Sequence, residues 1–275
     1  MFPEPVRKKV SLLVDEHFPW EGPVPERWEE RLAYVQRWLE QETAIYRAVA
    51  TALIARIDPI LSCLQQELPP PERGRFLYRI DDRHVLKTPE SILEKMVRRW
   101  EDPSHAPPIG FNNLDELNDL GRFRIVTNFL SDVTWICRHL EEPFDTRQRT
   151  RLSAQQQTLR QEFSLQANRF EDLLKVHPRK RTSGERCRKG HFSPKAPEHH
   201  ARRVEVQILT VLQEAWDKKD HFLIYERRRA GYPVDEEHEQ LSFSLSEQLY
   251  LTDRNFDQLK QASTRQDPRG GCEPE

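Results

Sequence analysis

A carboxylate stands directly before a β-rich segment near the middle of the chain. The segment from Asp119 to Arg124 reads Asp-Leu-Gly-Arg-Phe-Arg, with a glycine that lets the backbone pass close to a ligand. A carboxylate that binds a divalent cation beside guanidinium groups suits phosphoryl or pyrophosphoryl transfer, because that chemistry depends on charge neutralisation and positioning. The alternative is a loop aspartate next to an edge strand whose arginines only face water.

A second carboxylate lies on a segment of strictly alternating character. Val204, Val206 and Ile208 alternate with Glu205 and Gln207, which predicts a strand with both polar side chains on one face. Glu205 could bind a metal ion or act as the general base that takes a proton from an attacking hydroxyl. The alternative is an amphipathic strand whose polar face is simply solvated.

Two lysines flank a predicted helix start. Thr88 is a typical N-cap, Pro89 fits the first helical position and Glu90 complements the helix dipole. A helix N-terminus with Lys87 and Lys95 beside it would favour anionic phosphates. The alternative is that both lysines are solvated surface residues.

The stretch from His177 to Arg203 is strongly basic. It holds nine lysine and arginine residues, two glutamates and four histidines, which gives a local net charge of +7. Such a cluster favours a polyphosphate or an RNA backbone, whereas the alternative is a solvated loop. The histidines and Cys187 match no standard zinc-finger spacing.

Composition limits the other function classes. The 275 residues include 32% charged residues but carry a net charge of only −2, so they offer no overall attraction to nucleic acid or membrane. Four cysteines without a CxxC pair suit a reducing compartment. The start resembles no signal peptide, and no stretch approaches the ~18 apolar residues of a membrane span. We therefore expect a cytoplasmic protein that does not contact membranes.

Helical and strand patterns must position these residues. The inner face of the helix after Thr88 is predicted from Ile92, Leu93, Met96 and Trp100, and that of the helix after Thr210 from Leu212, Ala215, Trp216, Phe222 and Leu223. The remaining expected elements are two helices over 25–67, a strand within 75–83, a strand over 122–129, a helix over 133–140, a polar excursion over 145–168 and a helix over 244–259.

Taken in chain order, the motifs resemble the RelA/SpoT nucleotidyltransferase domain of alarmone synthetases. The four matching motifs are Lys-x-x-x-Ser-x-x-x-Lys from Lys87 to Lys95, Asp119 to Arg124 with Gly121 two residues after the aspartate, Glu-x-Gln-Ile-x-Thr from Glu205 to Thr210, and the spacing of Trp216, His221 and Tyr225. The resemblance spans residues 76–228. It implies an α+β fold of the nucleotidyltransferase type, with a mixed sheet flanked by helices. The implied divisions are an N-terminal helical region over 1–74, a synthetase domain over 75–228, and a C-terminal helix and disordered tail over 229–275.

The resemblance also implies an activity and a cofactor. Such enzymes transfer pyrophosphate from ATP to the 3′ hydroxyl of a guanine nucleotide, which makes a (p)ppGpp-type alarmone of the stringent response. Asp119 and Glu205 would be the catalytic residues and would bind Mg²⁺. The substrate- and phosphate-binding residues would be Lys87, Ser91, Lys95, Arg122, Arg124, Arg188, His191, Gln207 and His221.

Three positions depart from the family pattern. Val85 and Leu209 replace arginines, with Arg83 nearby but out of register, and Cys187 replaces the tyrosine that stacks on the acceptor guanine. These changes leave two alternatives open. One is pyrophosphorylation of the tRNA 3′ end by a growth-inhibiting toxin, with RNA contacts from 177–203. The other is a catalytically degenerate RNA-binding or regulatory relative. No His-Asp pair of the family's hydrolase domain is present, so hydrolysis is not expected. The sequence does not indicate which oligomeric state the protein adopts.

Overall fold

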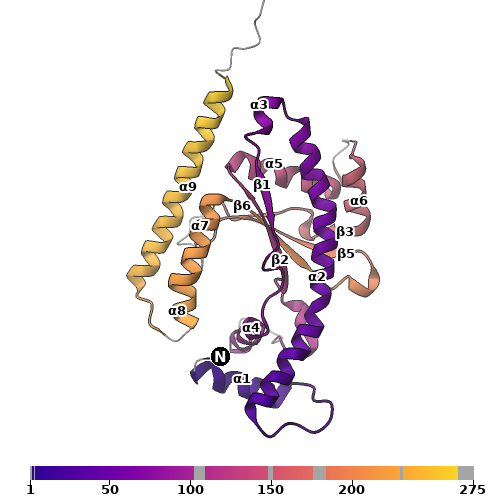
Figure 1. Ribbon diagram of the computed structural model, residues 1–275, viewed down its shortest axis with the longest axis vertical. Coiled ribbons are helices and arrows are strands. Elements are labelled where there is room, and N and C mark those ends of the chain that lie inside the picture. Colours follow the sequence, from indigo (N-terminus) through magenta and orange to yellow (C-terminus); the bar gives the residue numbers. More distant parts are fainter. Residues whose placement is uncertain are drawn as a thin grey trace, which may run out of the picture.

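The computed structural model describes residue 2 and residues 4–101, 109–147, 151–175, 184–229 and 232–265. At its centre lies a mixed sheet with the strand order β1-β2-β6-β5-β3, and β4 also pairs with β5 (Figure 1). β2 and β6 are parallel, and the other pairs are antiparallel. The predicted α+β class, with a mixed sheet flanked by helices, is confirmed. The strands are β1 (Tyr78–Asp81), β2 (Gly121–Thr127), β3 (Phe163–Leu165), β4 (Glu171–Asp172), β5 (Arg188–Pro194) and β6 (Val204–Thr210).

Helices flank the sheet and extend beyond it. The α-helices are α1 (Glu4–His17), α2 (Trp28–Glu67), α3 (Pro70–Arg73), α4 (Pro89–Glu101), α5 (Leu130–Glu141), α6 (Ala154–Glu162), α7 (Val211–Asp220), α8 (Glu226–Arg229) and α9 (Glu236–Arg265). Short helical turns are η1 (Phe111–Glu116), η2 (Glu142–Phe144), η3 (Gln166–Asn168), η5 (Pro197–His199) and the π-helical η6 (His221–Tyr225).

One face of the sheet carries the main hydrophobic core. Phe123 of β2 and Val206 of β6 share a buried cluster with Leu53 and Ile57 of α2 and Ile136 of α5. Because side chains alternate along a strand, the intervening residues of β2 and β6 project to the opposite face. The polar residues of the candidate site therefore lie on the side of the sheet away from α2 and α5.

Helix α2 corrects two predictions. It is a single helix from Trp28 to Glu67, although the sequence predicts two, because its buried stripe continues on both sides of Pro59 and packing outweighs the lost backbone donor. By length and composition it could also cross a membrane, contrary to the expected absence of such a stretch. The same apolar character serves a core helix, and α2 contributes Leu39 and Leu53 to two buried clusters.

A second buried cluster fixes the helix that borders the candidate site. Val14 of α1, Leu39 of α2 and Met96 of α4 are buried together. Ile92 and Leu93 join them as predicted, but Trp100 does not, since it is 37% exposed and meets His17 edge-on at the end of α4. The last turn of α4 thus lies at the rim of this cluster.

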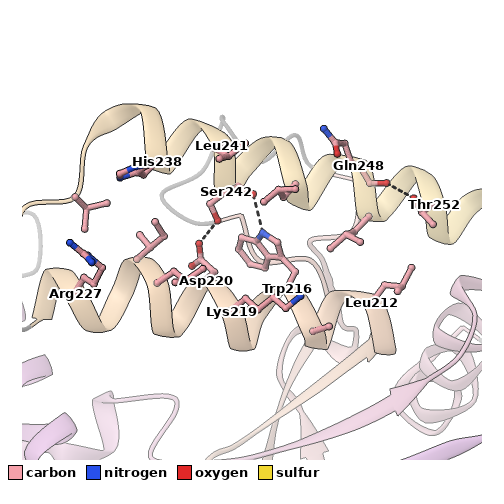
Figure 2. A pocket seen from close by; sticks show the side chains of 16 residues that line it. Leu212, Trp216, Lys219, Asp220, Arg227, His238, Leu241, Ser242, Gln248 and Thr252 are labelled. Atoms are coloured by element: carbon pink, nitrogen blue, oxygen red, sulfur yellow. Dashed lines mark hydrogen bonds between the residues drawn. The ribbon is translucent and has the colours of Figure 1, made fainter.

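Helices α7 and α9 lie side by side (Figures 1 and 2). The indole Nε1 of Trp216 donates a hydrogen bond to the carbonyl of Ser242 at 2.9 Å, and the Ser242 hydroxyl donates to Asp220. Between the helices lies a cavity of about 650 Å³ in which leucine is the commonest lining residue. The pair forms a wall beside the polar face of the sheet, to which it is joined by ion pairs described below.

The inner face of the segment after Thr210 differs from its prediction. Trp216 is buried as predicted, but Ala215, Phe222 and Leu223 are exposed, Phe222 to 72%. Ala215 and Leu223 line the open cavity between α7 and α9, and the π-helical turn η6 changes the 3.6-residue spacing after Asp220, where Phe222 is exposed.

The segment over 145–168 is partly core rather than a polar excursion. Residues 148–150 lie outside the described residues, but α6 and β3 follow and bury Leu159, Phe163 and Leu165. β3 completes the sheet by pairing with β5. Most described polar residues of this segment are exposed or half-buried, although Gln156 is buried, and this polar composition gave no sign of a sheet strand.

Candidate active site

Neighbouring strands bring two rows of polar side chains to one face of the sheet. Residues directly opposite each other on paired strands project to the same side. The first row, across β5, β6 and β2, is His191, Glu205 and Arg122, and the second row is Lys189, Gln207 and Arg124. Glu205 and Gln207 are 5% and 3% exposed, so these polar side chains are buried.

Asp119 lies in the turn that leads into β2. The backbone N–H of Lys87 donates to the carbonyl of Leu120 at 3.1 Å, and that of Arg122 donates to the carbonyl of Val85 at 2.8 Å. These two bonds hold the segment before α4 against the start of β2. Lys87 is thereby placed beside Asp119.

Two ammonium groups bind the Asp119 carboxylate. Lys87 Nζ lies 2.7 Å from Oδ2, and Lys95 Nζ lies 2.5 Å from Oδ1. Lys95 is carried by α4, whose start matches its prediction, because the Thr88 hydroxyl accepts the backbone N–H of Ser91 at 3.3 Å. Ser91 also lies on this first turn, where its own hydroxyl accepts a hydrogen bond from Thr88. Both ends of the predicted lysine motif therefore reach one carboxylate.

The charges around Asp119 fix its protonation state. Burial alone would raise the pKa of Asp119, but the charges of Lys87 and Lys95 outweigh it, so the pKa lies well below its usual range. Burial lowers the pKa of Lys95, although Asp119 opposes this shift. Asp119 is consequently an anion at neutral pH.

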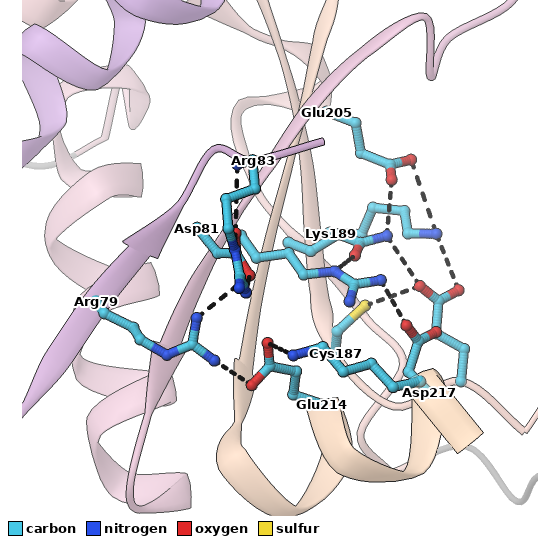
Figure 3. Close-up of polar contacts among 12 residues, drawn as sticks. Arg79, Asp81, Arg83, Cys187, Lys189, Glu205, Glu214 and Asp217 are labelled. Atoms are coloured by element: carbon cyan, nitrogen blue, oxygen red, sulfur yellow. Dashed lines mark hydrogen bonds and ion pairs between the residues drawn. The ribbon is translucent and has the colours of Figure 1, made fainter. Parts of the chain in front are cut away.

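Glu205 is buried among its own hydrogen-bonding partners (Figure 3). Gln207 Nε2 donates to Oε1 at 2.8 Å, while His191 Nε2 and Lys189 Nζ lie 3.4 and 3.8 Å from Oε2. Burial raises the pKa of Glu205, but the His191 hydrogen bond and the charge of Lys189 lower it below its ordinary value. Asp119 precedes the start of β2, whose Arg122 lies opposite Glu205, and the negative charge of Asp119 raises the same pKa.

The second row continues onto helix α7. Arg124 donates from Nε to Gln207 Oε1 at 2.9 Å and from its terminal nitrogen to Asp217 Oδ2 at 2.6 Å. The sequence predicts Arg124 as a phosphate-binding residue. In the free protein its guanidinium instead links β2, β6 and α7.

Strand β1 adds a further group of ion pairs to this face (Figure 3). Arg79 pairs with Asp81 at 3.2 Å and with Glu214 of α7, and Arg83 pairs with Asp81 at 2.6 Å. The Arg83 hydrogen bond outweighs burial and holds the pKa of Asp81 well below its usual range. Arg83 therefore forms its ion pair with Asp81 rather than with Asp119 or Glu205.

Three predicted substrate residues are placed differently from the rest. Arg188 alternates to the opposite face of β5 and pairs with Asp172 at 2.8 Å. His221 is exposed on η6, 3.6 Å from Glu226. Arg122 lies in the first row, and among the described residues its side chain makes no hydrogen bond or ion pair. The structure thus brings Arg122, but not Arg188 or His221, to the face of the sheet that carries Glu205.

Sequence reasoning missed several residues of this face. Lys189 lies two residues before His191, so strand alternation alone would have placed it beside Glu205. Glu185 and Asp217 come from a loop and a helix, and no periodicity in the sequence points to them. Glu185 is described further below.

The basic stretch is only partly described. Residues 177–183, with Arg179, Lys180 and Arg181, lie outside the described residues. In the remainder, three cations form ion pairs, namely Arg186 with Glu247, Arg188 with Asp172 and Lys189 with Glu185. The described part therefore offers less free positive charge than the sequence predicts for an RNA contact.

The positions that depart from the family pattern are buried. Cys187 is 1% exposed and packs with Val126 and Leu209 at the inner end of the polar face. Burial raises the pKa of its thiol far above the ordinary value, so it remains a neutral thiol. Val85 joins the main core. A small apolar patch thus stands where the family has a tyrosine and an arginine.

The carboxylates suit one kind of metal ion. Across the described ranges, no group of three or more histidine, cysteine or acidic residues could hold a metal. Mg²⁺ does not need such a group, because it commonly binds one or two carboxylates together with water and substrate phosphates. The donor set of Asp119 and Glu205 therefore fits Mg²⁺ bound with a nucleotide, and a protein-only zinc site is not supported.

Comparisons with known proteins agree with these motifs. A family profile described as "Region found in RelA / SpoT proteins" matches residues 84–230, just over half of the chain. Among curated proteins, no sequence matches. One solved structure that matches is the Bacillus subtilis small alarmone synthetase 1 bound to its product pppGpp, with 18% identity, a TM-score of 0.57, and coverage of 82% of this chain and 98% of that chain. The same synthetase bound to AMPCPP matches with 16% identity, a TM-score of 0.51, and coverage of 83% of this chain and 98% of that chain. The B. subtilis small alarmone synthetase 2 matches with 14% identity, a TM-score of 0.54, and coverage of 81% of this chain and 98% of that chain. At these identities the structures support a shared fold.

Proposed function

The chain belongs to the family defined by the region found in RelA/SpoT proteins, and on this premise we propose that it transfers pyrophosphate from ATP to the 3′ hydroxyl of a guanine nucleotide. The observation that carries the proposal is a pair of carboxylates on paired strands, Asp119 before β2 between two ammonium groups and Glu205 on β6 beside Lys189. A reaction between two polyanions requires both acidic and cationic groups at the reacting centre.

The donor side of the site is the Asp119 side. Lys87, Lys95 and Arg122 supply positive charge for the ATP triphosphate. The structure of small alarmone synthetase 1 bound to AMPCPP supports an ATP-like donor within this fold. When the triphosphate arrives, the two lysines can exchange part of their contact with Asp119 for phosphate oxygens.

Glu205 is the residue best placed to act as the base. Its lowered pKa keeps it ionised at neutral pH, so it can accept the proton of the acceptor 3′ hydroxyl. The hydroxyl oxygen forms a bond to the β-phosphorus of ATP as the bond from that phosphorus to the α,β-bridging oxygen breaks. AMP leaves with the electron pair, and the β- and γ-phosphates remain on the acceptor.

Asp119 with Glu205 would hold Mg²⁺, which supplies charge neutralisation for the phosphates when it is bound. Asp119 contacts two ammonium groups, and Glu205 lies 3.8 Å from the ammonium of Lys189. To bind Mg²⁺, Asp119 must be ionised, and the charges of Lys87 and Lys95 keep it ionised by lowering its pKa.

A polar cavity beside Glu205 is the candidate acceptor site. It has a volume of about 650 Å³ and includes Lys189 and His191, which border Glu205, together with Arg188. Arg188 lines this cavity from the opposite face of β5, where it pairs with Asp172. With Cys187 in place of a tyrosine, the acceptor base would lack an aromatic partner at that position.

The proposal is tested by incubation with γ-labelled ATP, Mg²⁺ and either GDP, GTP or tRNA, with products separated by charge. We expect label on a guanine nucleotide and none with Asp119→Asn. If the folded protein binds Mg·ATP yet labels no acceptor, the proposed activity fails. Label on tRNA alone would instead favour the toxin alternative.

A further inference from the structure

Glu185 is an acidic residue of the site that no motif assigns. It precedes β5, and its carboxylate contacts two residues of the second row. Lys189 Nζ lies 3.0 Å from Oε2, and Gln207 Nε2 donates to Oε1 at 3.0 Å. The thiol of Cys187 lies 3.6 Å from Oε1. Glu185 thus shares Lys189 and Gln207 as partners with Glu205.

Glu185 completes the hydrogen bonding of Gln207. The side-chain amide of Gln207 has two N–H donors, which it gives to Glu205 at 2.8 Å and Glu185 at 3.0 Å. Its carbonyl accepts from Arg124 at 2.9 Å. A buried amide with both donors and its acceptor used has one orientation. Without Glu185, one of these N–H groups would lose its partner inside the protein.

Glu185 also determines where Lys189 lies. The ammonium of Lys189 is 3.0 Å from Glu185 but 3.8 Å from Glu205. Without Glu185, the nearest remaining anion for this ammonium would be Glu205, which must stay accessible to a substrate proton. Glu185 therefore holds a cation close to the base while leaving a longer gap between them.

The backbone before Glu185 is held by α7 and α9. The hydroxyl of Ser246 donates to the carbonyl of Gly184 at 2.6 Å. A β-carbon at Gly184 would lie 2.6 Å from the ring of Trp216 and 3.1 Å from Phe243, so the segment is in close contact with both helices. Helix α9 begins at Glu236, after the family match ends at residue 230. Part of the support of the site thus lies outside the family region.

The residue after Glu185 is held by α9 as well. Arg186 is buried, pairs with Glu247 and stacks over the ring of Tyr250 at 4.6 Å. Glu185 therefore sits between two residues whose positions α9 fixes. A carboxylate on a mobile loop can change its position, whereas the backbone on both sides of Glu185 is fixed by these contacts.

We propose that Glu185 is a positioning residue for pyrophosphate transfer, which fixes Lys189 and Gln207 beside Glu205 and is itself held in place by α9. The proposal rests on the proposed function for its kinetic consequence, but not for its geometry. A misplacement of about 1 Å near reacting groups can reduce turnover by up to ~10²-fold.

The kinetic test is a double-mutant cycle of Glu185→Gln and Lys189→Met. We expect Glu185→Gln to lower kcat on the order of 10-fold with an unchanged KM for ATP, because the donor side is untouched. If Glu185 acts through Lys189, the double variant loses little more than Lys189→Met alone. Fully additive losses, or a changed KM for ATP alone, would overturn the proposal. Glu198→Gln, which alters an exposed glutamate away from the site, should behave as wild type.

The second test does not depend on activity. Hydrogen exchange of the Gln207 side-chain amide, assigned by its loss in Gln207→Leu, is measured by NMR. We expect slow exchange in the wild type, faster exchange in Glu185→Ala, and no change in Glu198→Gln. Fast exchange in the wild type overturns the proposal. A slow amide that becomes fast in Glu185→Ala supports it even if no transfer activity is found, so the two hypotheses can fail separately.

Discussion

Lys95 Nζ lies 2.5 Å from Asp119 Oδ1, so the proposed phosphate-binding cation and the proposed catalytic carboxylate are hydrogen-bonded to each other in the free protein. The charge of each group favours the charged form of the other. The pair also joins α4 to the start of β2, two elements that the sequence links only by the order of its motifs.

Replacement of Lys95 by methionine should weaken ATP binding. The change removes one charge-assisted hydrogen bond to a phosphate, which is worth about 1.5–3 kcal/mol, and we expect KM for ATP to rise on the order of 10-fold or more. The matched control is Lys9→Met, which removes an exposed lysine paired with Glu101 at the end of α4. Equal effects of the two changes would contradict a role of Lys95 in phosphate binding.

Replacement of Glu205 by glutamine should affect chemistry more than binding. Glutamine keeps the shape but accepts no proton, so kcat should fall about 10²–10⁴-fold if Glu205 is the base. Mg·ATP affinity, measured by calorimetry, reports separately on any role in metal binding. A variant that keeps most of its kcat would assign proton removal to another group.

Addition of a methyl group at Gly184 should disturb the site from a distance. In Gly184→Ala the new carbon would meet Trp216 at 2.6 Å, so the loop or the indole must move. We expect a loss of about 1–3 kcal/mol in unfolding free energy and a reduced kcat. Gly74→Ala is the control, since nothing lies within 4 Å of its added carbon. Denaturant unfolding and turnover together check both parts.

Asp253 predicts a pH dependence of stability. Burial raises its pKa, although hydrogen bonds from Thr210 and Gln213 oppose the shift. The folded protein therefore binds the proton more tightly than the unfolded chain, and stability falls as pH rises from the ordinary value of 3.8 through the raised one. Asp253→Asn keeps an acceptor oxygen and removes the charge.

The Asp253→Asn variant should gain stability relative to the wild type as pH increases. The difference is smallest at acidic pH, where the wild-type carboxyl is already protonated, and largest at neutral pH. Thermal unfolding from pH 3 to pH 7 measures it. A difference that does not depend on pH would show that the charge of Asp253 is compensated in the folded protein.

The local elements of the site could be predicted from the sequence. The alternation around Glu205, the N-cap at Thr88 and the glycine-containing start of β2 each depend on neighbouring residues, and each is found at its expected place. The mixed sheet and the family followed from the order of these motifs. The partners of the carboxylates followed only in part: alternation puts Lys189 on the same face as His191, but no local pattern shows that β5 pairs with β6.

The failures share a physical cause. Packing keeps α2 continuous through Pro59, and the π-helical turn at His221 changes a spacing that the sequence gives no reason to doubt. Glu185 contacts Gln207 although 22 residues separate them. Contacts of this kind depend on how the whole chain folds, so residue patterns within a short segment do not predict them.

The close packing at Gly184 has a consequence for how relatives of this chain can diverge. A larger side chain at position 184 is tolerated only if Trp216 or Phe243 shrinks at the same time, because both rings fill the space where its first carbon would stand. Substitutions at these three positions should consequently covary among homologues, so that a loop of the catalytic region and a helix outside it evolve as one unit.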